Sequence, residues 1–70
     1  MNITLNGQPF DIPTGTTLAS LVQLRQKSGH LKTNAYAIER NKEVLPRKNH
    51  ESTQLQPEDK IEIVVMVGGG

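Results

Sequence analysis

Cysteine and tryptophan are missing from this 70-residue chain, and phenylalanine and tyrosine occur once each. Without cysteine, the chain forms no disulfide, has no cysteine-ligated zinc site and holds no sulfur on a side-chain thiol. With two aromatic side chains, it also lacks the stacking surfaces on which single-stranded nucleic acids bind. These absences exclude several functional classes before any motif is considered.

An excess of one charge and a long hydrophobic run are also missing. Eight Lys and Arg stand against seven Asp and Glu, and the basic residues are scattered from Arg25 to Lys60 without a block. This distribution leaves no electrostatic footprint for nucleic acid. Met1 to Asn6 has no positively charged n-region, and no segment approaches membrane-spanning length. We therefore expect a cytoplasmic protein with neither nucleic acid nor membrane as a partner.

The N-terminal residues have the pattern of a β-hairpin. Apolar and polar residues alternate from Met1 to Asn6, and Asn6-Gly7 is a dipeptide that accepts positive φ at both turn positions. A second alternation follows from Gln8 to Pro13. Its Pro9 lacks an amide hydrogen, so we expect this second strand at the edge of a sheet.

One helix is predicted from about Thr17 to Ser28. Its apolar residues recur at three- and four-residue spacing and are expected to face the core; they are Leu18, Leu21, Val22 and Leu24. Thr17 is suited to cap the first turn, and Gly29 suits the left-handed conformation that follows a last turn.

Two short strands and a long polar loop are predicted after the helix. Residues 35–38 and 43–45 are rich in strand-forming residues. Residues 47–54 are expected to form a surface loop or a single helical turn, and Leu55 to enter the core. Residues 56–59 contain proline at the second position of a turn that leads into the last strand.

The longest apolar stretch lies at the C-terminal end of the sequence. Lys60 to Val67 is rich in β-branched residues and free of glycine and proline, which indicates a central strand with most of both faces covered. The glycines that follow, Gly68 to Gly70, add no sheet propensity and are costly to order. We expect one domain over residues 1–67 and a flexible tail over residues 68–70 with an unhindered terminal carboxylate.

The element order is thus β-β-α-β-β-β, an α+β domain. The helix must cover one face of a five-membered sheet, because neither element buries its apolar side alone. Parallel pairing of the first strand with the last gives a mixed sheet with the most apolar strand in its middle. This is the ubiquitin-like β-grasp arrangement.

Three stretches of the sequence carry a family resemblance. They are Glu43-Val44-Leu45-Pro46-Arg47, Leu55 to Val64, and Val67-Gly68-Gly69-Gly70. They resemble the ubiquitin-like sulfur carriers of thiamine biosynthesis, the ThiS family of the ThiS/MoaD superfamily, over essentially the whole chain. The departures lie in turns, since Glu58 and Asn41-Lys42 stand where many relatives have glycine-containing turns.

The resemblance implies a chemistry for the tail. In this family, a separate E1-like (ThiF-like) adenylyltransferase uses ATP and magnesium to adenylate the carboxylate that corresponds to Gly70. The adenylate is then converted to a thiocarboxylate with sulfur from a donor protein, and the thiocarboxylate supplies sulfur to a ThiG-like thiazole synthase. The resemblance therefore implies a protein cosubstrate and not an enzyme, with no bound cofactor, no metal site, and Gly68 and Gly69 required for access.

The residues themselves indicate that the carrier supplies the acyl group and that its partner supplies the ATP-binding machinery. No glycine-rich loop leads into a helix, so phosphate binding must belong to the activating enzyme. A three-residue tail reaches roughly 10 Å, which keeps the domain close to the partner's active site. Arg47 and Glu62 are our candidate contacts with that partner.

Two other functions stay open from the sequence. The small subunit of molybdopterin synthase, a MoaD-like carrier, shares the fold and tail chemistry, whereas the short chain and Val44-Leu45-Pro46-Arg47 favour the ThiS family. A ubiquitin-like binding or tagging module, joined to other proteins through Gly70 or acting through its sheet, belongs to a different class.

The remaining titratable residues have plainer interpretations. His30 and His50 lie in separate polar connections with no carboxylate or cysteine at ligand spacing, so both are predicted to be surface histidines. Glu58, Asp59 and Glu62 are predicted to be solvated surface charges, with an acidic spot for a basic partner as the alternative.

Overall fold

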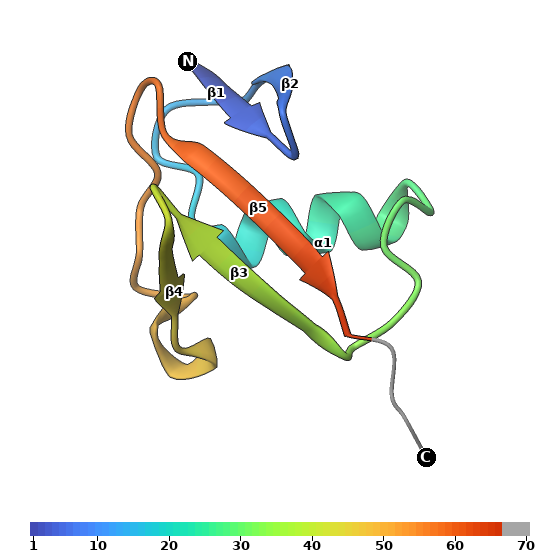
Figure 1. Cartoon of the computed structure of the whole chain (residues 1–70). Coiled ribbons are helices and arrows are strands. Elements are labelled where there is room, and N and C mark those ends of the chain that lie inside the picture. Colours follow the sequence, from blue (N-terminus) through green and yellow to red (C-terminus); the bar gives the residue numbers. More distant parts are fainter. Residues whose placement is uncertain (67–70) are drawn as a thin grey trace.

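A five-stranded sheet packs on one helix, and the computed structural model describes residues 1–66 (Figure 1). The elements in chain order are β1 (Asn2–Leu5), β2 (Gln8–Asp11), α1 (Leu18–Lys27), β3 (Tyr36–Arg40), β4 (Glu43–Leu45), the short 3-10 helix η1 (Arg47–Asn49) and β5 (Lys60–Val65). The predicted β-β-α-β-β-β order and β-grasp architecture are confirmed.

The last strand lies in the middle of the sheet. The strand order is β2-β1-β5-β3-β4, with β1 and β5 parallel and all other neighbours antiparallel. Figure 1 shows β5 between the N-terminal hairpin and β3. The parallel pairing of first and last strands and the edge position of the Pro9 strand are therefore as predicted. Asn6 and Gly7 join β1 to β2 with φ values of 49° and 80°, as their identity indicated.

The helix has the predicted bounds, with Thr17 and Ser28 as its caps. The Thr17 side chain accepts a hydrogen bond from the Ser20 N–H at 3.1 Å, and Gly29 has a φ of 81°. The prediction that Leu24 faces the core is wrong, since this side chain is 48% exposed. At 3.6 residues per turn, Leu24 lies roughly 160° around the axis from the buried Val22.

The core lies between α1 and one face of the sheet. Its buried apolar residues are Ile3, Leu5, Ile12, Leu18, Leu21, Val22, Leu31, Tyr36, Ile38, Leu55, Ile61 and Ile63. The prediction that most of both faces of the last strand are covered is wrong: Ile61 and Ile63 are buried, whereas Glu62 and Val64 between and after them are exposed. In residues 1–66 the helix covers one face of the sheet, so β5 alternates like a half-buried strand.

The loop between β4 and β5 packs along the start of the helix. The first amides of α1 donate to it, from Leu18 to the Thr53 carbonyl (3.0 Å) and from Ala19 to the His50 carbonyl (3.1 Å). These bonds satisfy helix N–H groups that have no partner within the helix. The prediction of a surface histidine is wrong for His50, because this side chain is 5% exposed and its Nε2 lies 3.1 Å from the Leu45 carbonyl oxygen. His30 is exposed, as predicted.

Candidate functional site

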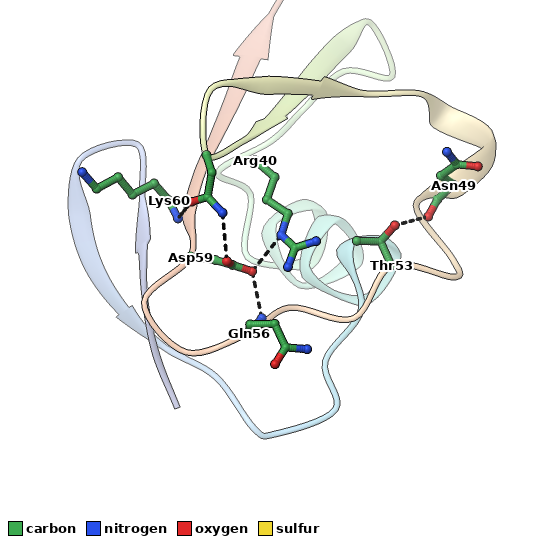
Figure 2. A network of polar contacts seen from close by, with 7 residues as sticks. Arg40, Asn49, Thr53, Gln56, Asp59 and Lys60 are labelled. Atoms are coloured by element: carbon green, nitrogen blue, oxygen red, sulfur yellow. Dashed lines mark hydrogen bonds and ion pairs between the residues drawn. The ribbon is translucent and has the colours of Figure 1, made fainter.

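A buried carboxylate fixes the start of β5 (Figure 2). Asp59 is 5% exposed and accepts hydrogen bonds from Arg40 Nε (2.9 Å), Asn41 Nδ2 (3.1 Å) and the Gln56 N–H (2.8 Å). Asn41 also accepts the Lys60 N–H through Oδ1 at 2.9 Å. The interpretation of Asp59 as a solvated surface charge is therefore wrong, because the end of β3 and the turn before β5 close over its side chain.

The turn before β5 has an unusual residue at its third position. Glu58 has a φ of 69°, and the Asp59 N–H lies 3.2 Å from the Gln56 carbonyl that accepts it. Pro57 at the second position and positive φ at the third define a type II turn, in which glycine is preferred at the third position. The departure at Glu58 thus falls where glycine would be least strained.

The end of β5 leads toward the predicted tail. The Met66 N–H donates to the Ala35 carbonyl at 2.8 Å, which holds the last described residue against the chain that enters β3. Val64, Val65 and Met66 are all about half exposed, at 46%, 50% and 58%. The predicted tail Gly68, Gly69 and Gly70 and the predicted boundary at residue 67 lie outside the described residues.

Arg47, a predicted partner contact, is held by the domain itself. Its Nη2 donates to the carbonyls of Asn34 (2.8 Å) and Tyr36 (3.1 Å), and its guanidinium carbon lies 4.0 Å from the centre of the Tyr36 ring. These contacts tie η1 to the start of β3. Arg47 also lines a hollow of about 390 Å³ beside α1, which His50 borders as well.

Glu62, the other predicted contact, lies on the open face of the sheet. It pairs across the ladder with Glu39 of β3, a residue that no local sequence pattern indicates. Neither ion pair found in residues 1–66 includes Glu62 or Arg47, so no ion pair joins the two predicted contacts. The register of β3 against β5 was the signal that would have identified Glu39.

The described part of the chain offers no metal centre and no membrane span. Within residues 1–66, no group of three or more His, Asp or Glu side chains could hold a metal ion. No helix in the same residues is long and apolar enough to cross a bilayer.

Comparison with known proteins identifies the relatives of this fold. The model of the ThiS family matches residues 3–70. Among solved structures, the crystal structure of the thiamine biosynthesis protein ThiS from Geobacter metallireducens superposes with a TM-score of 0.77, at 26% identity and full coverage of both chains. Its solution structure gives a TM-score of 0.70 at 28% identity, covering 100% of this chain and 88% of the other.

Curated relatives extend over the whole of this chain. A thiazole synthase from Magnetococcus marinus is 39% identical over 70 residues, and the chain spans 20% of that protein's length. An uncharacterized protein, ycf40, from Porphyra purpurea is 33% identical over 70 residues, which cover 93% of its length. Because the family model and the complete β-grasp domain agree over nearly every residue, this chain belongs to the ThiS family of small sulfur carrier proteins, which are not catalysts.

Proposed function

We propose that this chain carries sulfur as a thiocarboxylate at Gly70 and delivers it for thiazole formation in thiamine biosynthesis. The observation that carries the proposal is the match to the ThiS family through residue 70, which includes the three glycines after β5. The absence of cysteine supports it, because no side chain among these 70 residues can hold the sulfur as a thiol or persulfide instead.

Activation of the carboxylate is the first chemical step of the proposal. A carboxylate is a poor acyl donor because it is anionic and resonance-stabilised. Attack of a Gly70 oxygen on the α-phosphorus of ATP releases pyrophosphate and makes an acyl adenylate, whose AMP is a good leaving group. Hydrosulfide then forms the C–S bond as the C–O bond to AMP breaks, which exchanges one carboxylate oxygen for one sulfur.

A separate enzyme supplies the machinery for this step. Adenylation needs ATP, magnesium and stabilisation of charge on the transferring phosphorus. We propose an E1-like (ThiF-like) adenylyltransferase as that enzyme, since the chain has no glycine-rich loop that opens a helix. A sulfur donor protein supplies the sulfur, and the carrier contributes the acyl group and the surface that docks it.

A ThiG-like thiazole synthase is the proposed acceptor of the sulfur. The thiazole synthase of Magnetococcus marinus contains a segment that is 39% identical to this whole chain. A carrier segment joined to a synthase in one polypeptide raises the effective concentration of one for the other. We therefore propose that this chain delivers its sulfur to a synthase of the same class, and not to molybdopterin synthase.

Intact-mass spectrometry tests the proposal directly. The purified chain is incubated with the ThiF-like enzyme of the same genome, ATP, magnesium and sodium sulfide. The expected product is heavier by the exchange of one oxygen for one sulfur, located in a peptide that ends at Gly70. The same spectrum reports whether Gly70 is the terminus of the mature chain.

Two variants serve as controls. Deletion of Gly70 should abolish the product without changing the thermal melt, because the carbonyl no longer reaches the adenylation site. Gly69→Val should act similarly, since a β-branched side chain restricts the backbone and widens the tail. Thiocarboxylate formed at normal yield by the Gly70 deletion contradicts the carrier mechanism, and a ubiquitin-like tag would then be the better interpretation.

A further inference from the structure

The second half of β5 has an open backbone edge. β1 pairs with β5 only through Thr4↔Lys60 and Leu5↔Ile61, whereas β3 follows β5 as far as Val65. Figure 1 shows the result: the N-terminal hairpin flanks the first half of β5, and β3 runs along the other side to its end. The sheet therefore has an edge in its middle, beyond the point where β1 stops.

The direction of the backbone groups determines what this edge offers. The Met66 N–H donates to Ala35 on the β3 side, and successive residues of a strand alternate, so Ile63 and Val65 direct their N–H and C=O groups to the other side. The Asn6 side-chain oxygen accepts the Ile63 N–H at 2.8 Å. Within residues 1–66, no hydrogen bond reaches the Ile63 carbonyl or the N–H and carbonyl of Val65. An added strand would find both donors and acceptors there.

Apolar side chains surround this edge. Val64, Val65 and Met66 follow one another and are 46%, 50% and 58% exposed. Since successive side chains of a strand point to opposite faces, the exposed apolar surface lies on both sides of the open edge. Three consecutive exposed apolar residues mark an interaction site more often than isolated exposed residues do.

A pair of like charges lies next to Val64 on the open face of the sheet. Glu39 and Glu62 are directly opposite each other in the β3–β5 ladder, on the same face of the sheet as Val64. Like charges in that position destabilise a sheet. Neither ion pair found in residues 1–66 includes them, and Lys60, two residues before Glu62 on the same face, pairs with neither. The two glutamates therefore have no ion-pair partner within residues 1–66, and a docking protein can supply one.

We infer that the second half of β5 docks an extended strand of a partner protein that carries a basic residue. The added strand forms hydrogen bonds with Ile63 and Val65, covers Val64, and sets a Lys or Arg side chain against the two glutamates. A second copy of this chain is a poorer occupant, because it presents the same acidic pair. The inference rests on the proposed function, which makes the ThiF-like adenylyltransferase the partner.

The edge is tested with Val65→Pro. Proline removes an N–H that faces away from β3, so the ladder with β3 is retained and the domain should fold. Val65→Ala is the matched control, which shortens the side chain and keeps the N–H. By titration calorimetry with the adenylyltransferase, we expect Val65→Pro to bind about tenfold more weakly than Val65→Ala.

The charge pair is tested by neutralising each glutamate. Glu39→Gln and Glu62→Gln should each raise Tm by about 1 to 6 °C, because the like-charge repulsion is removed. The same variants should bind the adenylyltransferase about tenfold more weakly. Glu51→Gln, an exposed glutamate in the loop after η1, should change neither quantity. A purely structural pair would not move stability and affinity in opposite directions.

The outcomes separate this inference from the proposed function. Wild-type chain that yields no thiocarboxylate with the same enzyme overturns the proposed function. Normal thiocarboxylate, with affinities unchanged in Val65→Pro and in both glutamine variants, overturns the docking surface alone. A wild-type dimer in sedimentation velocity that Val65→Pro dissociates also overturns it, because the edge would then belong to self-association.

Discussion

Replacement of Asp59 by alanine should remove a large part of the stability of the domain. Its carboxylate is 5% exposed and accepts three hydrogen bonds, from Arg40, Asn41 and the Gln56 backbone. The donors belong to the end of β3, the turn that follows it and the turn before β5. One side chain thus joins the segments that set the register of the central strand.

The size of the stability loss in Asp59→Ala follows from the burial of the carboxylate and from the number of its hydrogen-bond donors. Removal of one partner of a buried, hydrogen-bonded ion pair costs about 3 to 5 kcal/mol. The Arg40 side chain is 28% exposed, so water solvates part of the freed guanidinium and the lower end of that range applies. At about 0.05 to 0.15 kcal/mol per residue, the whole domain is stable by roughly 3.5 to 10 kcal/mol. The variant should therefore lose from a third to nearly all of its stability.

Urea titration followed by far-ultraviolet circular dichroism measures the loss. The midpoint should fall while the slope m stays unchanged, since the surface exposed on unfolding is nearly the same. Asp11→Ala is the control: its carboxylate is 87% exposed and lies 3.4 Å from the N-terminal amine, so its loss should cost less than about 1 kcal/mol. An Asp59→Ala variant within about 1 kcal/mol of the wild type would refute the structural role of this carboxylate.

Three further substitutions test the sheet and its turns. Ile63→Asp should unfold the domain, because an unpaired carboxylate buried in the central strand costs several kcal/mol. Val64→Asp, on the exposed face of the same strand, should still melt cooperatively. An unchanged melt of the Ile63→Asp variant would show that Ile63 does not belong to the core. Glu58→Gly should raise Tm by about 4 to 8 °C, since roughly 1 kcal/mol of left-handed strain is relieved, and a lower Tm would contradict this account of the turn. Arg47→Lys should lower stability by about 1 to 2 kcal/mol in urea titration, because lysine lacks the planar group that stacks on Tyr36 and bonds two carbonyls. Equal stability of the lysine variant would mean that these contacts do not hold Arg47 to the domain, and that its side chain is free to contact a partner.

The local elements of this protein could be predicted from the sequence because each depends on neighbouring residues. The alternation of apolar residues in the first strands, the Asn6-Gly7 turn and the helix between Thr17 and Ser28 act over a few positions of the chain. The central place of β5 also followed from composition, because the most apolar strand is the one that gains most from neighbours on both sides.

The burial of individual polar residues was decided by tertiary contacts. Asp59 and His50 lie in segments that read as polar loops, and each is buried because elements distant in the chain close over it. Arg47 was correctly seen as a charged residue after β4, but the carbonyls that hold it belong to residues 34 and 36. No local pattern encodes such partners, since a hydrogen bond forms wherever folding brings a donor to an acceptor.

Some features of the candidate site follow from the sequence, and others depend on the tertiary structure. The sequence by itself determined that the chain is one ThiS-like domain, that no thiol is available and that three glycines follow the last strand. Only the tertiary structure decided that β1 ends halfway along β5, so that Val65 faces an open edge, and that Glu39 lies opposite Glu62. Strand lengths are local, but the register between strands is set by the packing of a whole sheet against its helix. That register determines which side chains and backbone groups the protein presents to a partner.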